Sequence, residues 1–445
     1  MSIEFTDGTL GSSPFSLLPQ IPAIVSEWCA LIPLVFHLAT PREDYITIGE
    51  VSLLGRICVP LLPRLGALLG LARLLNGGPK HLDYASFGAG GSSRTVWDVK
   101  WGSVFPAANG AAVVWISDYL RRRTKPGVVD MPEDDSTNLQ NTITSSTTSD
   151  TSQARKESTG NNAGPRRYQT LHVYNFEFIP KSANQKRVSL VSSRVVNICE
   201  YLFMTAVVII LCVLGAYGTA VVIFCTMVSQ LVGRSITAIR PSTYLENTEL
   251  HDAGMLVAAH QNAVEWHLYI GNRAIVDTLL NKPMVSFPDG PGAKLAGRWF
   301  EVAHILQLAS MTYIAAQKGW DGVFLLLLIT GYDVYRFLTR GHSLARAWLD
   351  AEGVDAKVAT FRFSGRTPML GAVELFKGRG REAWMDLILV PHPRREAWLR
   401  VIRGQSDSSE GLDHGDRRWV EYMSKAALAA FGKLLDEFQT TGATT

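Results

Sequence analysis

Charged residues are scarce in this sequence of 445 residues, because Asp, Glu, Lys and Arg together make up only 19% of it. Soluble domains carry about 25%, so the composition favours a protein with apolar surroundings. The formal net charge is +3, which is too small to indicate binding of nucleic acid. We therefore expect membrane lipids among the partners of the protein and no nucleic acid.

Motifs for catalysis and for metal binding are also missing. The five cysteines lie in apolar segments without CxxC spacing, so neither a zinc site nor a disulfide scaffold is indicated. The sequence has no nucleotide-binding, hydrolase, zinc-protease or kinase motif. We predict no catalytic residue, no cofactor and no metal ion. The first residues lack a basic segment followed by an apolar core, so we expect no cleaved signal peptide.

The longest apolar stretch runs from Val195 to Val232 and has Glu200 as its only charge. One straight helix of that length would measure about 57 Å, whereas the hydrocarbon core of a bilayer is about 30 Å thick. Gly215 to Gly218 lies near the midpoint and supplies a turn. We predict a transmembrane hairpin over residues 195–236. The alternatives are one strongly tilted helix and a buried helix of a soluble core.

A second apolar pair, within residues 298–339, is interrupted at Gln317 to Gly322. Two hairpins would place the remaining segments on one side of the membrane. Basic residues flank that side of both hairpins, namely Lys186, Arg187, Arg194, Arg234, Arg240, Arg298, Arg336, Arg340 and Arg346. The positive-inside rule then places the soluble parts in the cytosol. The expected fold is mainly α: a polytopic helical membrane protein with two transmembrane hairpins and a small cytosolic α+β region.

The first 125 residues form a membrane-associated region with three further apolar segments. Residues 17–39 are expected to span the membrane, to lie in its interface or to re-enter it. Residues 51–75 contain three arginines, which fit an interfacial amphipathic helix as well as a span. Residues 101–120 precede three consecutive arginines and fit a span.

The remaining segments are polar or of mixed composition. Residues 126–167 are rich in Ser and Thr and are predicted to be a disordered linker. Residues 168–194, 237–297 and 340–445 are the cytosolic segments. In them the alternation of apolar residues and the turn residues predict strands at 169–179, 255–259, 265–270 and 358–363, and helices at 274–280, 393–403 and 416–438.

A few ionisable residues are candidates for function. Glu301 and His304 share a helix face and would suit a proton or ion relay, although both fit a helix end near the headgroups. Glu200, Asp333 and Arg336 fit helix ends in the same way. The candidates for a metal site are His251, His260 and His267, but their spacing does not suit zinc. Arg394 and Arg395 would meet lipid phosphate or form salt bridges on a domain surface.

Several cytosolic segments carry a resemblance to a known group of proteins. They are AHQNAVEWHLYIGNR at 259–273, Val276-Asp277, Leu280–Pro283, Gly365–Thr367, Gly371-Ala372, Trp384–Asp386, Arg394-Arg395 with Trp398, and Asp98–Val104. Together they resemble fungal multi-pass membrane proteins of uncharacterised function. The resemblance implies a membrane location and a shared fold, and it implies no activity.

We expect an integral membrane protein that acts as a non-enzymatic platform and binds a cytosolic protein partner. The working assumption for its location is the plasma membrane. A transporter or channel is the first alternative, motivated by Glu301 and His304. A lipid-modifying enzyme, with His260 and His267 as candidate catalysts, is the third hypothesis.

Overall fold

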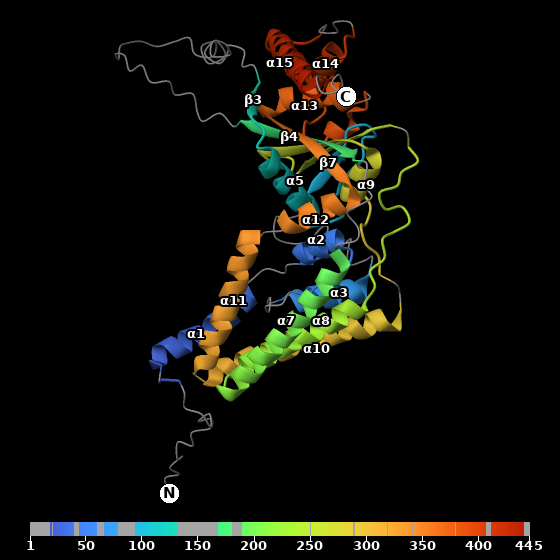
Figure 1. Ribbon diagram of the computed structural model, residues 1–445. Coiled ribbons are helices and arrows are strands. Elements are labelled where there is room, and N and C mark those ends of the chain that lie inside the picture. The colour runs from blue at the N-terminus through green and yellow to red at the C-terminus, as the bar shows by residue number, and fades with distance from the viewer. Residues whose placement is uncertain are drawn as a thin grey trace, which may run out of the picture.

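The computed structural model describes residues 18–19, 21–39, 44–59, 66–78, 94–131, 168–179, 189–249, 251–287, 290–317, 319–339, 342–378, 380–405 and 411–439. These residues form two parts, which lie one above the other in Figure 1. The upper part, the α/β domain, is a mixed sheet with helices on both faces. The lower part, the apolar lobe, is a group of long apolar helices.

The sheet of the α/β domain has seven strands in the order β2-β1-β5-β6-β4-β7-β3. They are β1 (Thr95–Asp98), β2 (Val104–Pro106), β3 (Val128–Asp130), β4 (Gln169–Phe178), β5 (Ala253–Ala258), β6 (Glu265–Gly271) and β7 (Val354–Phe363). The pairs β4–β6 and β3–β7 are parallel, and the other neighbours are antiparallel. The centre of the sheet therefore joins strands that are far apart in the sequence.

Alternation along the strands divides the core into two layers. On β4, Leu171 and Val173 belong to one layer while Tyr174 and Phe176 belong to the other, because successive side chains of a strand point to opposite faces. The first layer packs on α13 (Arg366–Lys377), α14 (Pro393–Ile402) and α15 (His414–Gln439), next to the short 3-10 helix η1 (Glu382–Met385). The second packs on α5 (Ala111–Thr124), α9 (Arg273–Leu280) and α12 (His342–Glu352).

Tryptophans fill the layer beneath α13, α14 and α15. Trp97 and Trp266 are fully buried, and their ring centroids are 5.6 Å apart. Burial of each such side chain contributes at least about 1.5–3 kcal/mol. Gly371 lets the helices approach, since a Cβ atom there would lie 2.6 Å from the Trp398 ring.

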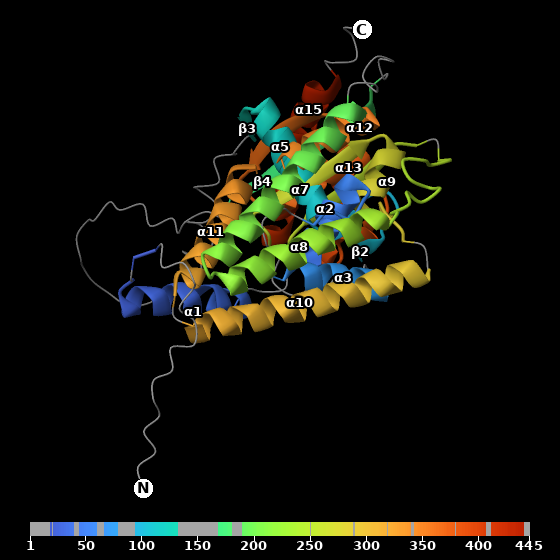
Figure 2. The same cartoon turned by 60° about the horizontal axis from the view of Figure 1, so that its bottom comes forward.

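The apolar lobe consists of α1 (Ala23–Ala39), α3 (Ala67–Gly77), α7 (Ser189–Val213), α8 (Tyr217–Ser235), α10 (Pro291–Gln317) and α11 (Trp320–Thr339). Figures 1 and 2 show α7 and α8 side by side, joined by a short turn. α8 also packs along α10, and α10 packs on α3. α11 packs against α1 and departs from α10.

A buried carboxylate fixes the tip of the lobe. Asp321, in the first turn of α11, accepts hydrogen bonds from the backbone N–H groups of Gly218 and Thr219, each at 2.8 Å. These are among the N–H groups at the start of α8 that have no partner within the helix. Asp321 is 4% exposed. The side chain therefore ties the start of α8 to the start of α11.

Arg240 connects α2 (Asp44–Leu54) to the α/β domain. Arg240 donates from Nη1 to the carbonyl oxygens of Ser52 and Met284, at 2.6 and 2.9 Å. Its guanidinium also lies over the Tyr244 ring, 4.4 Å from the centroid. Because Ser52 belongs to the last turn of α2, the cation also offsets the negative end of that helix dipole.

The prediction of a mainly α, polytopic membrane protein is wrong. The described residues form thirteen α-helices around and beneath a seven-stranded mixed sheet. Only one of the described helices, α8, is long and apolar enough to cross a bilayer, and 56% of its apolar window is buried inside the structure. The multi-pass architecture with two transmembrane hairpins, and the transmembrane helices that it requires, are therefore not supported.

The three N-terminal apolar segments adopt different structures. Residues 17–39 contain α1, which holds Pro33. Residues 51–75 are divided between the end of α2 and α3, and Arg73 of α3 pairs with Asp44 of α2 at 3.2 Å. Residues 101–120 contain β2 and most of α5, which covers the sheet. In the predicted linker, Val128–Asp130 form β3, while residues 132–167 lie outside the described part of the chain.

Candidate functional site

A groove lies at the carboxyl ends of the parallel strands β4 and β6. These strands pair in register up to Phe176 and Gly271, so their ends meet at one edge of the sheet. Ligands of open α/β sheets bind in crevices outside the carboxyl ends of parallel strands. Two neighbouring hollows of about 630 and 380 Å³ form the groove, and Phe178, Asp252 and Asn272 line both.

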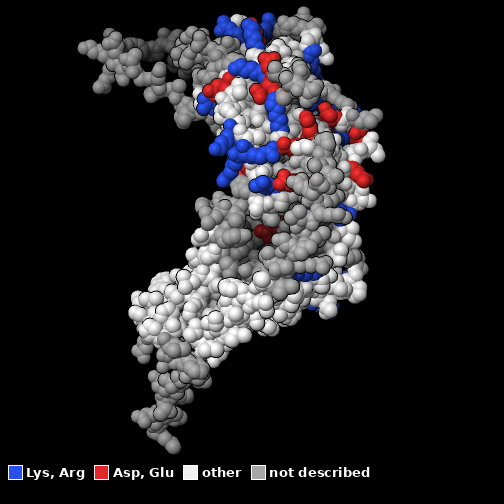
Figure 3. All heavy atoms as spheres, in the orientation of Figure 1, with Lys and Arg blue, Asp and Glu red and all other residues white. Residues whose placement is uncertain are grey.

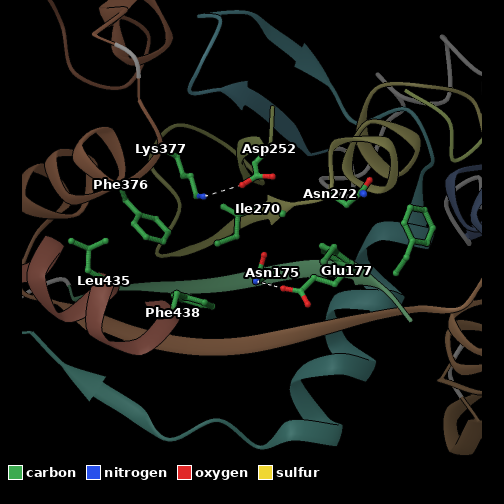
Figure 4. Close-up of a pocket in the computed structure, with 12 residues that line it drawn as sticks. Asn175, Glu177, Asp252, Ile270, Asn272, Phe376, Lys377, Leu435 and Phe438 are labelled. Atoms are coloured by element: carbon green, nitrogen blue, oxygen red, sulfur yellow. Dashed lines mark hydrogen bonds and ion pairs between the residues drawn. The ribbon is translucent and has the colours of Figure 1, made fainter. Parts of the chain in front are cut away.

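The larger hollow has an apolar wall and a polar wall (Figure 4). Phe376, Leu435 and Phe438, from α13 and α15, form the apolar wall, and the two phenylalanine centroids are 6.0 Å apart. Asn175 and Glu177 of β4 lie opposite, where the Asn175 amide donates to the Glu177 carboxylate at 2.9 Å. The hollow therefore suits a ligand with both an apolar and a polar end.

Lys377 is the cation of this hollow. Its ammonium lies 4.0 Å from Asp252 Oδ2 and 5.1 Å from the Phe376 ring centroid. Burial lowers the pKa of Lys377, while the Asp252 carboxylate raises it. Gly254 of β5 leaves room for the lysine stem, because a Cβ atom there would lie 3.0 Å from Lys377 Cβ. An amine in this position can hold an anionic or carbonyl oxygen of a ligand.

Acidic and basic side chains pair with one another at the smaller hollow. Arg273 Nε lies 2.9 Å from Glu249 Oε2 and 3.3 Å from Asp277 Oδ2. His251 Nε2 lies 3.0 Å from the same Glu249 oxygen. Burial raises the pKa of Asp277, and the Arg273 charge opposes that rise. Two carboxylates share the charge of Arg273, so this hollow is less suited than the larger one to hold an anionic group.

Gly271 and Asn272 shape the junction between the hollows. Gly271 has φ +95°, and a Cβ atom there would lie 2.3 Å from the Phe176 carbonyl oxygen. This left-handed conformation strongly favours glycine. Asn272 follows as the N-cap of α9, where its side chain accepts a hydrogen bond from the Ala274 N–H at 3.0 Å. The pair turns the chain sharply from strand into helix at the floor of the groove.

A second polar cluster lies between the sheet and α5, with its two histidines, His172 and His267, buried. His172 Nε2 lies 3.1 Å from Glu265 Oε1, and His172 Nδ1 lies 2.9 Å from the Thr360 hydroxyl. The hydrogen bond from His172 lowers the pKa of Glu265 to about 2, helped by the charge of Arg121. Burial lowers the pKa of His267 well below its ordinary value. Neither hollow of the groove includes these residues, so we interpret the cluster as structural.

The three histidines considered for a metal site do not come together. His251 lies in the smaller hollow, and His267 is buried under α5. His260 accepts a hydrogen bond from the Asn262 N–H at 3.1 Å within the turn between β5 and β6. Among the described residues, no group of three His, Cys, Asp or Glu side chains could hold a metal ion.

The other candidates lie on helices. Glu301 of α10 accepts a hydrogen bond from Asn76 at 2.8 Å, and His304 lies one turn further along the same helix. Asp333 is exposed on α11, where Arg336 also lies, and Glu200 lies on α7.

The two arginines considered for lipid phosphate have protein partners. Arg394 lies 3.3 Å from Asp416 Oδ1 and its guanidinium is 4.4 Å from the Trp419 ring centroid. Arg395 is 3% exposed and lies 2.7 Å from Asp386. Both residues therefore stabilise the packing of α14.

The sequence did not reveal the groove, because five segments that are far apart in the sequence form it. The one local signal was Gly271-Asn272 after a predicted strand, a pair that suits a strand-to-helix turn. Comparison of the chain with protein-family models, with curated proteins and with solved structures found no match.

Proposed function

We propose that the protein binds a lipid membrane through its apolar lobe and holds the α/β domain there as a non-enzymatic binding platform. The observation that carries this proposal is the separation of charge in Figure 3. Lys, Arg, Asp and Glu gather on the α/β domain, whereas the region where Figure 1 places α1, α8, α10 and α11 is almost entirely uncharged.

Large apolar side chains are exposed on all five long helices of the lobe. At least half of the surface of each of the following is exposed: Ile24, Trp28, Leu202, Phe203, Ile209, Phe224, Leu231, Leu295, Ile305 and Leu327. Contiguous apolar patches beyond a few hundred Å² mark interaction sites for proteins or membranes. Burial of one such side chain contributes about 1.5–3 kcal/mol, so a few of them suffice for stable binding to lipid.

The lobe also buries the polar side chains that a water-exposed helix would turn outward. On α8, Thr226 and Ser229 are buried, whereas Phe224 and Leu231 are exposed. Thr226 Oγ1 accepts a hydrogen bond from Gln307 of α10 at 3.3 Å, and Ser229 Oγ accepts one from Trp299 at 3.1 Å. Small and polar residues between helices, with large apolar residues outside, are typical of helix packing in lipid.

The proposal concerns the surface that meets lipid, and it does not restore the transmembrane hairpins. The platform role rests on the groove of the α/β domain and on the absence of a catalytic motif from the sequence. Neither alternative gains support, since Glu301 is paired with Asn76 and His260 lies apart from the buried His267. The cytosolic location of the α/β domain stays a prediction.

Flotation of the purified full chain with phosphatidylcholine vesicles tests the proposal. We expect the wild type to float, and Phe203→Asp and Leu327→Asp to lower the partition coefficient into vesicles at least tenfold, since each removes about 1.5–3 kcal/mol of apolar burial. The matched control is Val390→Asp, because Val390 is 73% exposed but lies in the α/β domain. Wild-type protein that stays with the soluble fraction would refute the proposal, as would equal losses for all three variants.

A further inference from the structure

An apolar groove runs between α8 and α10 on the surface of the lobe. It has a volume of about 580 Å³. Its walls are formed mainly by Val228, Val232, Leu295, Ala296, Trp299 and Val302. The hydrogen bond from Trp299 Nε1 to Ser229 holds the indole ring in the wall at 3.1 Å. We propose that this groove holds one acyl chain of an anionic phospholipid, with the phosphate at Lys294 and Arg298. The inference rests on the proposed membrane binding of the lobe.

The length of the groove suits one leaflet of a bilayer. On α10 the lining residues extend from Gly292 to Val302, which is about 15 Å along a helix axis. Half of a hydrocarbon core of about 30 Å has the same depth. α8 runs antiparallel to α10, because Ser229 meets Trp299 while the end of α8 at Ser235 and the start of α10 at Gly292 line the same groove.

The charge at one end of the groove is positive. Lys294 and Arg298 are exposed and four residues apart on α10, so they lie on one face of the helix. Within the described part of the chain neither has an ion pair with an acidic side chain, and no acidic residue lines the groove. Side chains of a helix lean toward its N-terminus, which directs Arg298 toward Lys294 at the end of the groove where α10 begins.

These features favour a phospholipid over other occupants. The lining is apolar along its length and offers few polar groups, so a polar peptide would lose hydrogen bonds to water there. A free phosphate ion would use the two cations and leave the apolar walls exposed. An anionic phospholipid matches both the apolar walls and the two cations. Its acyl chain would lie between α8 and α10, and its headgroup would lie at the basic end of the groove.

Photocrosslinking tests the inference on the full chain. Phosphatidylglycerol with a diazirine on one acyl chain is mixed into phosphatidylcholine vesicles, and the crosslinked residues are mapped by mass spectrometry. We expect crosslinks on the walls of the groove. Gly292→Phe should block them, because Gly292 lines the groove. The fold should tolerate this change, since an added Cβ atom at Gly292 meets only open space. Gly432→Phe, at an equally open helical position of α15, is the matched control and should change nothing.

The basic end is tested separately by the dependence of flotation on anionic lipid. Arg298→Gln should weaken binding to vesicles with phosphatidylglycerol about fivefold, the equivalent of about 1 kcal/mol for one cation at a membrane surface. Arg346→Gln, on α12 of the α/β domain, should not. If the protein floats but its crosslinks are spread evenly over the lobe and do not change in Gly292→Phe, the inference about the groove is overturned. Loss of wild-type flotation on neutral vesicles would overturn the membrane proposal itself.

Discussion

Substitution of Asn109 tests how the groove of the α/β domain is held in place. The Asn109 side chain is 1% exposed and lies at the C-terminal end of α9. Its Nδ2 donates to the carbonyl oxygens of Thr278, Leu279 and Lys282 at 2.7, 2.8 and 2.9 Å. Its Oδ1 accepts from the Met284 N–H at 3.0 Å. One amide thereby satisfies the end of the helix whose other end forms the floor of the groove.

The magnitude follows from these contacts. A hydrogen bond contributes about 1 kcal/mol net, and a buried group left without a partner costs about 1–3 kcal/mol. We therefore expect Asn109→Ala to lower the free energy of unfolding by about 3 kcal/mol. Asn109→Asp should cost more at pH 7, because it directs a buried negative charge at three carbonyl oxygens. Asn281→Ala, at an exposed neighbouring position, should change stability by less than about 0.5 kcal/mol.

Chemical denaturation in detergent at several pH values, followed by intrinsic fluorescence, gives the comparison. Burial raises the folded pKa of a carboxyl group introduced at Asn109, so the folded Asn109→Asp chain binds a proton before the unfolded chain does. Its deficit relative to the wild type should then shrink as the pH falls from 7 to 5. An Asn109→Asp chain as stable as the wild type, or a deficit that grows on acidification, would refute the reasoning.

Three further predictions concern other positions of the fold. Burial lowers the pKa of His267 below its ordinary value of 6.5, so the unfolded chain binds a proton before the folded chain does. Stability should therefore fall by up to about 1.4 kcal/mol per pH unit below pH 6.5, and His267→Gln should flatten this slope in denaturation titrations. Gly271→Ala should cost at least about 2 kcal/mol, because its φ is +95°, and thermal unfolding will show a fall in Tm that Gly292→Ala lacks. Asp321→Ala should remove the cap of α8 and cost about 2 kcal/mol, with faster hydrogen exchange at the Gly218 amide as the specific readout.

Local elements could be predicted from the sequence where turn residues and alternation agree. The strand predicted at 169–179 is β4 at Gln169–Phe178, and the helix predicted at 274–280 is α9 at Arg273–Leu280. The last two helices, predicted at 393–403 and 416–438, are α14 and α15. The break between the helices at 195–236 also falls near Gly215, between α7 and α8. Each of these signals lies within one short segment.

The architecture and the groove could not be predicted in this way, since both depend on distant pairings. The predicted strands at 169–179 and 265–270 pair with each other in parallel, as β4 and β6, across almost a hundred residues. β1 and β3 are too short to show a periodic pattern, and the run that contains most of α5 has the composition of a membrane span. The sequence therefore predicts only a small cytosolic α+β region, although the sheet is the centre of the α/β domain.

The interpretation of α8 shows why an apolar run alone is ambiguous. An apolar helix of this length can be buried in protein or can face lipid, and α8 does both. The side that packs on α10 carries small and hydroxylated residues, including Thr226 and Ser229, and the opposite side carries Phe224 and Leu231. A helix in water would place its large apolar residues inward. The direction of this asymmetry, which only the packing reveals, favours lipid as the environment of the outer face, and the flotation of Phe203→Asp and Val390→Asp decides whether that inference holds.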